Sequence, residues 1–360
     1  MSLPKLRTWA ALAALVVAVQ APAFAGEKAD PSNQKRIELQ LQGIDRQIDE
    51  FRKSGGWSKK QRPRLIIQGD ATSSALLAAL KKHGVQVRQG SRGGRHLAIE
   101  LSGDDAKWLK DVQGISGVSL DAPVAAAPLA NTEVVPPGGT YTAVGGGNKR
   151  ARQTVGANSL ITGDGSTFNG NELRALLGVA NDPHRGAGVG IAIIDSGIAP
   201  VADLADRITA FYDFTNGQGG VPTTPVDGYG HGTHVAGLVA GSGLMSNGQY
   251  EGVAPAAHLI GLRVLDDSGS GSTSDVIAAI EFATANKAAL GIDVMNLSLG
   301  HPPYESAATD PLVQAVQAAT QAGIVMVVSA GNAGVNPTTG LVGYAGLLAP
   351  GNAPNAITVA

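Results

Sequence analysis

The stretch Ile191-Ala192-Ile193-Ile194-Asp195-Ser196-Gly197 places an aspartate and a turn directly after an uninterrupted apolar run. Such a run, without polar alternation, is typical of a strand that is buried on both faces, as in a parallel sheet. We therefore predict a strand over Gly190–Ile194, with Asp195 partly buried at its carboxyl end. A buried carboxylate needs a partner, and an imidazole N–H is a natural one. The alternative is that Asp195 only caps a turn.

From residue 171 onward, apolar runs alternate with Ala-rich stretches of helical character. This alternation predicts an α/β domain over residues 171–360, with a doubly wound, mostly parallel sheet. The chain stops inside a further apolar stretch, Ala356–Ala360, so we expect the domain to be incomplete at its C-terminus. The predicted strands are Gly190–Ile194, His258–Leu265, Ile292–Leu299 and Ile324–Ala330, and the predicted helices are His231–Gly241, Ser274–Leu290 and Asp310–Gly323.

The N-terminus has the pattern of a secretory signal peptide. Lys5 and Arg7 precede the apolar run Trp9–Val19, which is followed by Ala23-Phe24-Ala25. We predict cleavage after Ala25 and secretion to the periplasm, the cell surface or the medium; an N-terminal membrane anchor is the alternative. No later segment reaches the roughly 20 apolar residues that a membrane-spanning helix needs, so no stable span is expected after cleavage.

Three further regions separate the signal peptide from the α/β domain. Residues 26–63 contain an amphipathic helix, with Ile37, Leu41, Ile44, Ile48 and Phe51 on one stripe. Residues 64–124 are predicted to form a small α+β domain in the order βαββαβ, which is ferredoxin-like. Residues 125–170, part of a stretch rich in Ala, Pro and Gly from 122, are predicted to be a linker. Its basic cluster at 149–152 is either a processing site or a solvated loop.

Composition excludes several function classes. The net charge is −2 and there is no strong basic excess, so a nucleic-acid partner is not expected. The 360 residues include no cysteine, which excludes disulfides and thiol chemistry. The stretch Gly186–Gly190 superficially resembles a nucleotide-binding loop. It precedes a strand, however, where a dinucleotide fold needs it to follow one and open a helix.

A second motif, Gly230-His231-Gly232-Thr233-His234, opens the first predicted helix of the α/β domain. An imidazole at His231 can accept a proton from a nucleophile while it donates its other N–H to Asp195. Zinc binding by His231 and His234 is the alternative. Zincins, however, carry H-E-x-x-H, and here Gly232 stands in the glutamate position. His234 is predicted to be a packed, structural histidine.

A third motif, Val328-Ser329-Ala330-Gly331-Asn332, ends the last full strand. An asparagine there can direct its side-chain amide at a developing oxyanion. Taken alone, such a turn is weak evidence, because asparagine is common in turns.

The order Asp195, His231, Asn332, each beside a sheet element, resembles the subtilisin-like serine proteases, the subtilase family. The resemblance covers roughly residues 186–360. It implies that Asp195 is the triad acid, His231 the general base and Asn332 the oxyanion donor. It also implies substrate-binding segments, one pairing with an extended peptide and one lining the specificity pocket: Ser268, Gly269, Ser270 and Gly271, and Ser298, Leu299 and Gly300.

The resemblance further implies that the 64–124 unit is a prodomain, which aids folding and inhibits the protease until it is removed. The maturation cut could fall anywhere from Asp121 to about Asn171. One feature departs from the family: no G-T-S-M-A-like nucleophile segment occurs. Ser196 and Ser329 belong to other motifs and are not candidates. This chain is therefore expected to be inactive as given, and the complete protein to be a secreted, monomeric serine endopeptidase precursor acting on proteins or peptides.

Two other functions are open from the sequence. The chain could be a non-catalytic secreted protein that binds extended peptides, or the prodomain-like unit could act as a free protease inhibitor. The proposed chemistry needs no cofactor. Structural calcium is implied by the resemblance, but no EF-hand spacing is present and no ligands are assigned. The acidic residues in loops near the predicted site are Asp203, Asp206, Asp213 and Asp227.

Overall fold

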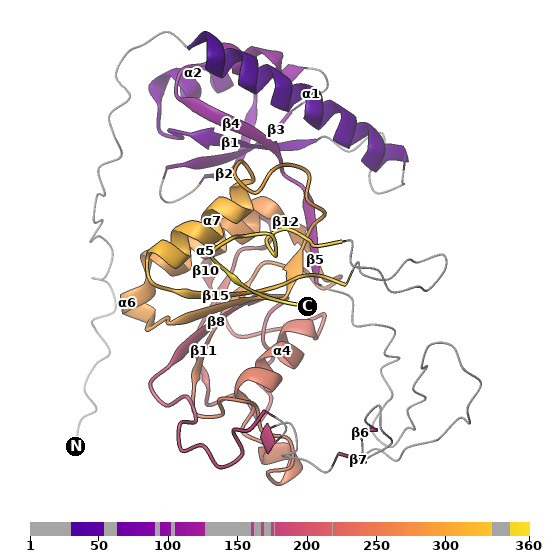
Figure 1. Ribbon diagram of the computed structural model, residues 1–360. Helices are drawn as coiled ribbons and strands as arrows, with labels where there is room; N and C mark the ends of the chain where they lie inside the picture. The colour runs from indigo at the N-terminus through magenta and orange to yellow at the C-terminus, as the bar shows by residue number, and fades with distance from the viewer. Residues whose placement is uncertain are drawn as a thin grey trace, which may run out of the picture.

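The computed structural model describes residues 30–53, 63–90, 94–101, 105–126, 160–161, 167–168, 174–175, 177–217, 219–332 and 346–360. The predicted signal peptide and the basic cluster at 149–152 lie outside these ranges. Two units stand one above the other in Figure 1, each built on its own sheet. None of the helices in the described ranges has the length and apolarity needed to cross a membrane.

The first unit is a four-stranded antiparallel sheet in the order β2-β3-β1-β4, with helices on one face. Its elements follow the predicted βαββαβ order, except that the second helix is a 3₁₀ helix. They are α1 (Pro31–Lys53), β1 (Arg64–Gly69), α2 (Ser74–Lys82), β2 (Gln86–Gly90), β3 (His96–Glu100), η1 (Asp105–Asp111) and β4 (Ile115–Leu120).

Helix α1 covers this sheet with the stripe expected from its sequence. Ile37, Leu41, Ile44 and Ile48 are all buried, in one cluster with apolar residues of β1, β3 and β4. The side chains of β1 alternate, as a strand requires. Leu65 and Ile67 belong to the cluster under the helices, whereas Ile66 belongs to the core of the second unit. The sheet therefore lies between its own helices and the second unit.

The second unit is a seven-stranded sheet in the order β10-β9-β11-β8-β13-β15-β16, in which only the β10–β9 pair is antiparallel. Strands β9 and β10 are additional to the predicted ones. The predicted helix at 274–290 is divided in two at Asn286. The elements are β8 (Gly190–Asp195), β9 (Ile208–Asp213), β10 (Val221–Pro222), α4 (His231–Ala240), β11 (His258–Arg263), α5 (Thr273–Ala285), α6 (Lys287–Leu290), β13 (Val294–Leu297), α7 (Pro311–Gln321), β15 (Val325–Ser329) and β16 (Ile357–Val359).

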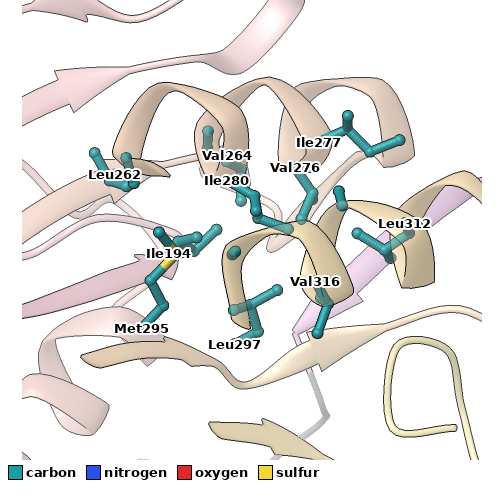
Figure 2. Close-up of a cluster of buried hydrophobic side chains, with 14 of the residues drawn as sticks. Ile194, Leu262, Val264, Val276, Ile277, Ile280, Met295, Leu297, Leu312 and Val316 are labelled. Atoms are coloured by element: carbon teal, nitrogen blue, oxygen red, sulfur yellow. The ribbon is translucent and has the colours of Figure 1, made fainter. Parts of the chain in front are cut away.

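Helices cover both faces of the seven-stranded sheet. Ile191 and Ile193 of β8 pack in the same cluster as residues of α4. Ile194 points to the opposite face, where α5 and α7 bury Ile280 and Val316 against the sheet (Figure 2). An uninterrupted apolar strand is what a strand covered on both faces needs. The predicted α/β class with a doubly wound, mostly parallel sheet is confirmed.

Polar side chains connect the two units. Gln68 of β1 donates to the carbonyl of Thr309, at 2.9 Å. Asp121, fully buried just after β4, accepts hydrogen bonds from the backbone N–H and the hydroxyl of Ser274, at 2.8 and 2.9 Å. Arg64 forms an ion pair with the same carboxylate at 2.8 Å. The interface therefore contains buried charge as well as apolar contact.

A short strand, β5 (Pro123–Ala126), runs from the first unit into the second. It lies between β12 (Ser270–Ser272) and β14 (Leu299–Gly300), antiparallel to both, in a three-stranded sheet. The sequence predicted a prodomain boundary at 124 and a linker from there. The structure instead continues into a paired strand, because its partners are supplied by distant parts of the chain.

Two carboxyl groups, the half-buried Glu305 and the buried Asp275, make the interface sensitive to pH. Burial raises the pKa of Glu305, which bonds to Ser119 of β4, to about 7. Burial also raises the pKa of Asp275, in the first turn of α5, to about 6. A raised carboxyl pKa means that the folded state favours the protonated form. The stability that each group contributes is thus complete below the pKa that the group has in the unfolded chain. It is lost as the pH rises from there through the pKa in the folded state, which is about 6 for Asp275 and about 7 for Glu305.

We therefore predict that Glu305→Gln, which imitates the protonated group, gains stability over the wild type as the pH rises from 5 to 8. Urea unfolding at each pH measures the difference. Glu50→Gln, on the exposed side of α1, is the control and should give a difference that does not change with pH. A Glu305→Gln difference that is flat across this range would contradict the raised pKa of Glu305.

Candidate active site

The candidate site lies at the carboxyl end of β8, where the order of the sheet reverses. Strand β8 is flanked by β11 on one side and β13 on the other. In open α/β sheets, crevices for ligands form at such switch points. Asp195 is the last residue of β8, and α4, which packs against this strand, begins at His231. The topology alone thus brings two residues 36 positions apart to one place.

The Asp195 carboxylate is fully buried, and its hydrogen bonds come from groups of the protein. Its Oδ1 accepts the backbone N–H of Ser196 at 2.7 Å. The backbone around it is also fixed, since the N–H groups of Val264 and Leu265 both donate to the carbonyl of Asp195. Arg263 donates through Nε to the carbonyl of Ser196 at 3.2 Å. The turn that bears the carboxylate is therefore fixed by hydrogen bonds from the segment Arg263–Leu265.

His231 completes the arrangement. Its Nδ1 lies 2.8 Å from Oδ1 and 3.0 Å from Oδ2 of Asp195, and its side chain is only 5% exposed. Burial opposes the charged ring, but the hydrogen bond and the charge of Asp195, with a further contribution from Asp227, raise the pKa of His231 above its ordinary value. With Nδ1–H donated to Asp195, the lone pair of the neutral ring is on Nε2. The geometry thus presents Nε2 as a proton acceptor.

Two glycines permit this close approach. A Cβ on Gly232 would lie 2.1 Å from the carbonyl oxygen of Gly197 and 3.1 Å from Cβ of Asp195. A Cβ on Gly197, whose φ is +124°, would lie 2.0 Å from the carbonyl oxygen of Val226. The first turn of α4 can therefore reach the Asp195 turn only because both positions lack side chains.

In the predicted segment Ser268–Gly271, one part pairs with β5 and the other part forms a turn. Ser270 and Gly271 pair with Ala125 and Val124 of β5, and the carbonyl of Gly269 accepts the N–H of Ala126 at 3.1 Å. Ser268 lies in the turn, where its hydroxyl and N–H donate to Asp266 instead. Three of the four predicted residues therefore contact an extended segment through their backbone.

The predicted segment Ser298–Gly300 forms the opposite edge. Leu299 and Gly300 pair with Ala126 and Ala125 of β5, whereas the Ser298 hydroxyl accepts a hydrogen bond from Asn296 at 3.0 Å. The two edges leave space for one extended strand, which β5 occupies. Asn332, the predicted oxyanion donor, is an exposed residue just beyond the carboxyl end of β15.

One site expectation is wrong and one contributor was missed. His234 is exposed, not packed, because it lies opposite the buried stripe of Gly232, Ala236 and Ala240 on α4. The sequence presented Asp227 only as an acidic loop residue. Its carboxylate accepts hydrogen bonds from the backbone N–H groups of Gly230 and Thr233, at the start of α4. The available signal was an aspartate just upstream of a helix whose N-cap residue, Gly230, has no side chain.

The acidic loop residues that the structure describes make contacts within the protein and do not gather around one point. Within the described ranges, no group of three or more His, Asp or Glu side chains is arranged to hold a metal ion. Asp213 is instead paired with Arg263 at 2.8 Å, and Asp203 accepts the N–H of Met245 at 2.7 Å. The predicted structural calcium therefore stays a prediction without ligands.

The site consists of a buried Asp–His pair at the switch point of a doubly wound α/β domain. Such a pair is two-thirds of the Ser-His-Asp triad that many hydrolases use. Residues 186–360 match the sequence profile of the subtilase family, peptidase S8. This part of the chain therefore belongs to the subtilase family.

Individual relatives agree with this assignment. Serine protease AprX of Bacillus subtilis (strain 168) is 43% identical over 205 residues, which are 52% of this chain and 44% of that protein. Subtilisin DY of Bacillus licheniformis is 41% identical over 162 residues, covering 45% of this chain and 53% of the relative. The chain thus spans about half the length of the curated relatives it matches.

A solved structure extends the likeness beyond residues 186–360. Fervidolysin from Fervidobacterium pennivorans, a keratinolytic enzyme related to subtilisin, aligns with a TM-score of 0.58 and 21% identity. The alignment covers 84% of this chain and 44% of that structure. At this identity the likeness concerns the fold alone.

The two glycines of α4 provide a matched test of the site geometry. Gly232→Ala is predicted to destabilise the protein by about 1–3 kcal/mol, because the added methyl group must displace backbone atoms. Gly237→Ala, in the same helix with nothing within 4 Å of its added Cβ, should stabilise it by about 0.5–1 kcal/mol through helix propensity. Chemical denaturation of both variants measures the difference, and equal effects would argue against the close contact.

Proposed function

We propose that the complete protein is a secreted serine endopeptidase precursor that hydrolyses peptide bonds in proteins or peptides. The observation that carries the proposal is the buried Asp195–His231 hydrogen bond at the switch point of a subtilase-family domain. Relatives named as serine protease and subtilisin add support. Export is proposed on the signal-peptide pattern of residues 1–25.

In the proposed mechanism, a serine supplied from outside these 360 residues attacks the scissile carbonyl. His231 Nε2 accepts the proton of that serine and later donates it to the leaving amine. Asp195 holds the imidazole in the required tautomer and stabilises the imidazolium that forms. Asn332 donates to the oxyanion of the tetrahedral intermediate. An acyl-enzyme forms and is released by water.

The substrate is proposed to bind as an extended strand between the two backbone edges. Segments Ser270–Gly271 and Leu299–Gly300 would pair with its main chain, so that affinity depends largely on backbone hydrogen bonds. Support comes from β5, which makes such pairing on both sides at Ala125. Buried Val124 and Ala126 alternate with exposed Pro123 and Ala125, as expected for a strand whose alternate side chains enter pockets.

The first unit is proposed to be the intramolecular inhibitor of this site. It contacts the second unit through Gln68 and Asp121, and it inserts β5 where a substrate would pair. In this proposal the unit is removed by a cut between Asp121 and about Asn171, and the protein acts as a monomer. Calcium is proposed as a stabilising ion, with no ligand set assigned.

A serine-directed phosphonate probe tests the proposed chemistry on the full-length protein. We expect covalent labelling at a serine downstream of residue 360, in a G-T-S-like segment. Asp195→Asn should lower kcat by about 10⁴-fold, since the imidazole then loses its tautomer and orientation. A full-length protein that binds peptides with no turnover and no labelling would support the non-catalytic binding function instead.

The inhibitory role of β5 has a separate test. Val124→Lys places a charge at a side chain that is 1% exposed, which burial strongly disfavours. The phosphonate probe should therefore label the full-length precursor carrying Val124→Lys faster than the wild-type precursor. Val124→Ile, which keeps the apolar contact, is the control. If all three precursors react at the same rate, β5 does not restrict access to the site.

A further inference from the structure

The loop before α4 contains an aspartate that replaces the missing N-cap side chain. The N-cap position is Gly230, with φ of 93°. Asp227 Oδ1 accepts the N–H of Gly230 at 2.8 Å, and its Oδ2 accepts both the N–H and the hydroxyl of Thr233, at 2.8 and 2.6 Å. These contacts fasten the chain on both sides of His231. A carboxylate at a helix N-terminus also interacts favourably with the helix dipole.

The same carboxylate connects the helix to the turn that follows Asp195. The Ser196 hydroxyl hydrogen-bonds to Asp227 and accepts the N–H of Gly232 at 3.0 Å. The Thr233 hydroxyl, held by Asp227, accepts the N–H of Ala199 at 2.9 Å. One hydrogen-bond network thus joins the turn that follows Asp195 to the first turn of α4. The carboxylate of Asp227 is the charged group in this network.

The electrostatics agree with this arrangement. Partial burial opposes the charge of Asp227, but hydrogen bonds from Thr233 and Gly230 hold its pKa below the usual value. Asp227 is therefore an anion at neutral pH, and its negative charge contributes to the raised pKa of His231. Tyr229, whose ring centroid is 6.5 Å from that of His231, is the neighbouring titratable group in the same loop.

We propose that Asp227 is a positioning residue for the proposed triad: it holds the His231 ring against Asp195 by fastening the first turn of α4. Its charge additionally favours the imidazolium that forms when His231 accepts a proton. The proposal rests on the proposed protease function for its kinetic consequences, but not for its structural ones. It requires two separable contributions, one from the hydrogen bonds and one from the charge.

Three variants of the full-length protein separate these contributions. Asp227→Asn removes the charge and weakens the cap, and should lower kcat on the order of tenfold, with little change in KM, because a small misplacement of a catalytic group is costly. It should also move the acidic limb of the kcat/KM profile to lower pH. Thr233→Val removes the two hydrogen bonds of the hydroxyl, with Asp227 and with the N–H of Ala199, but keeps the charge of Asp227. It should therefore lower kcat less and leave the acidic limb in place. Asp227→Glu should restore the position of the limb but not kcat.

The control variant is Asp182→Asn, on an aspartate whose side chain is 38% exposed and accepts hydrogen bonds from His184. It should leave kcat, KM and the pH profile unchanged. Thermal melts followed by circular dichroism establish that each variant is folded. If Asp227→Asn does not fold, Asp227→Glu and Thr233→Val decide the question.

A titration of the His231 imidazole by NMR tests the proposal without reference to activity. The pKa of His231 should be lower in Asp227→Asn than in the wild type, and unchanged in Thr233→Val. An unchanged His231 titration together with unchanged kcat would overturn the role of Asp227. If the wild-type protein has no peptidase activity, the proposed function fails, and the titration still decides whether Asp227 acts on His231.

Discussion

A single buried charge, the carboxylate of Asp195, constrains the architecture of the second unit. It lies at the end of an apolar strand with no exposure to solvent, where an unsatisfied carboxylate would be strongly destabilising. Its donors are the N–H of Ser196 and the ring of His231, so the turn and the helix start must both come within hydrogen-bond distance. That distance in turn excludes side chains at Gly197 and Gly232. The sheet topology, the start of α4 and the glycine positions are thus all needed to provide hydrogen bonds to this one carboxylate.

The contact between the two units has a mixed character that follows from the same physics. Ile66 enters the core of the second unit, but beside it Asp121 is buried with Arg64 and the hydroxyl of Ser274 as partners. Polar contacts of this kind require accurate geometry to offset the loss of hydration. They therefore specify one docking arrangement, whereas apolar contact alone would tolerate several. Such an interface is typical of units that are able to separate.

Local sequence signals predicted much of the fold, and long-range pairing accounts for what they missed. The run at 190–194 and the stripe from Ile37 to Ile48 contain their own evidence of burial, and both formed the expected elements. Residues 123–126 contain no such signal, because Pro, Val and Ala pair there only with segments far along the chain. At the site, the local motifs around Asp195 and His231 and the order of the two residues predicted their pairing. The exposure of His234 and the capping by Asp227 depend on how α4 is rotated and how its preceding loop is folded, which residue types alone do not determine.

The three-stranded arrangement around β5 has a consequence for any chain that takes its place. Ala125 is paired on its two sides at once, with Ser270 and with Gly300. A peptide held in this way offers both of its backbone edges to the groove, so it cannot also belong to a helix or to the middle of a sheet. Entry to the groove therefore depends on the free energy of local unfolding of the incoming chain. If substrates take the place of β5 as proposed, the groove would distinguish them by their conformational order before their side chains make contact.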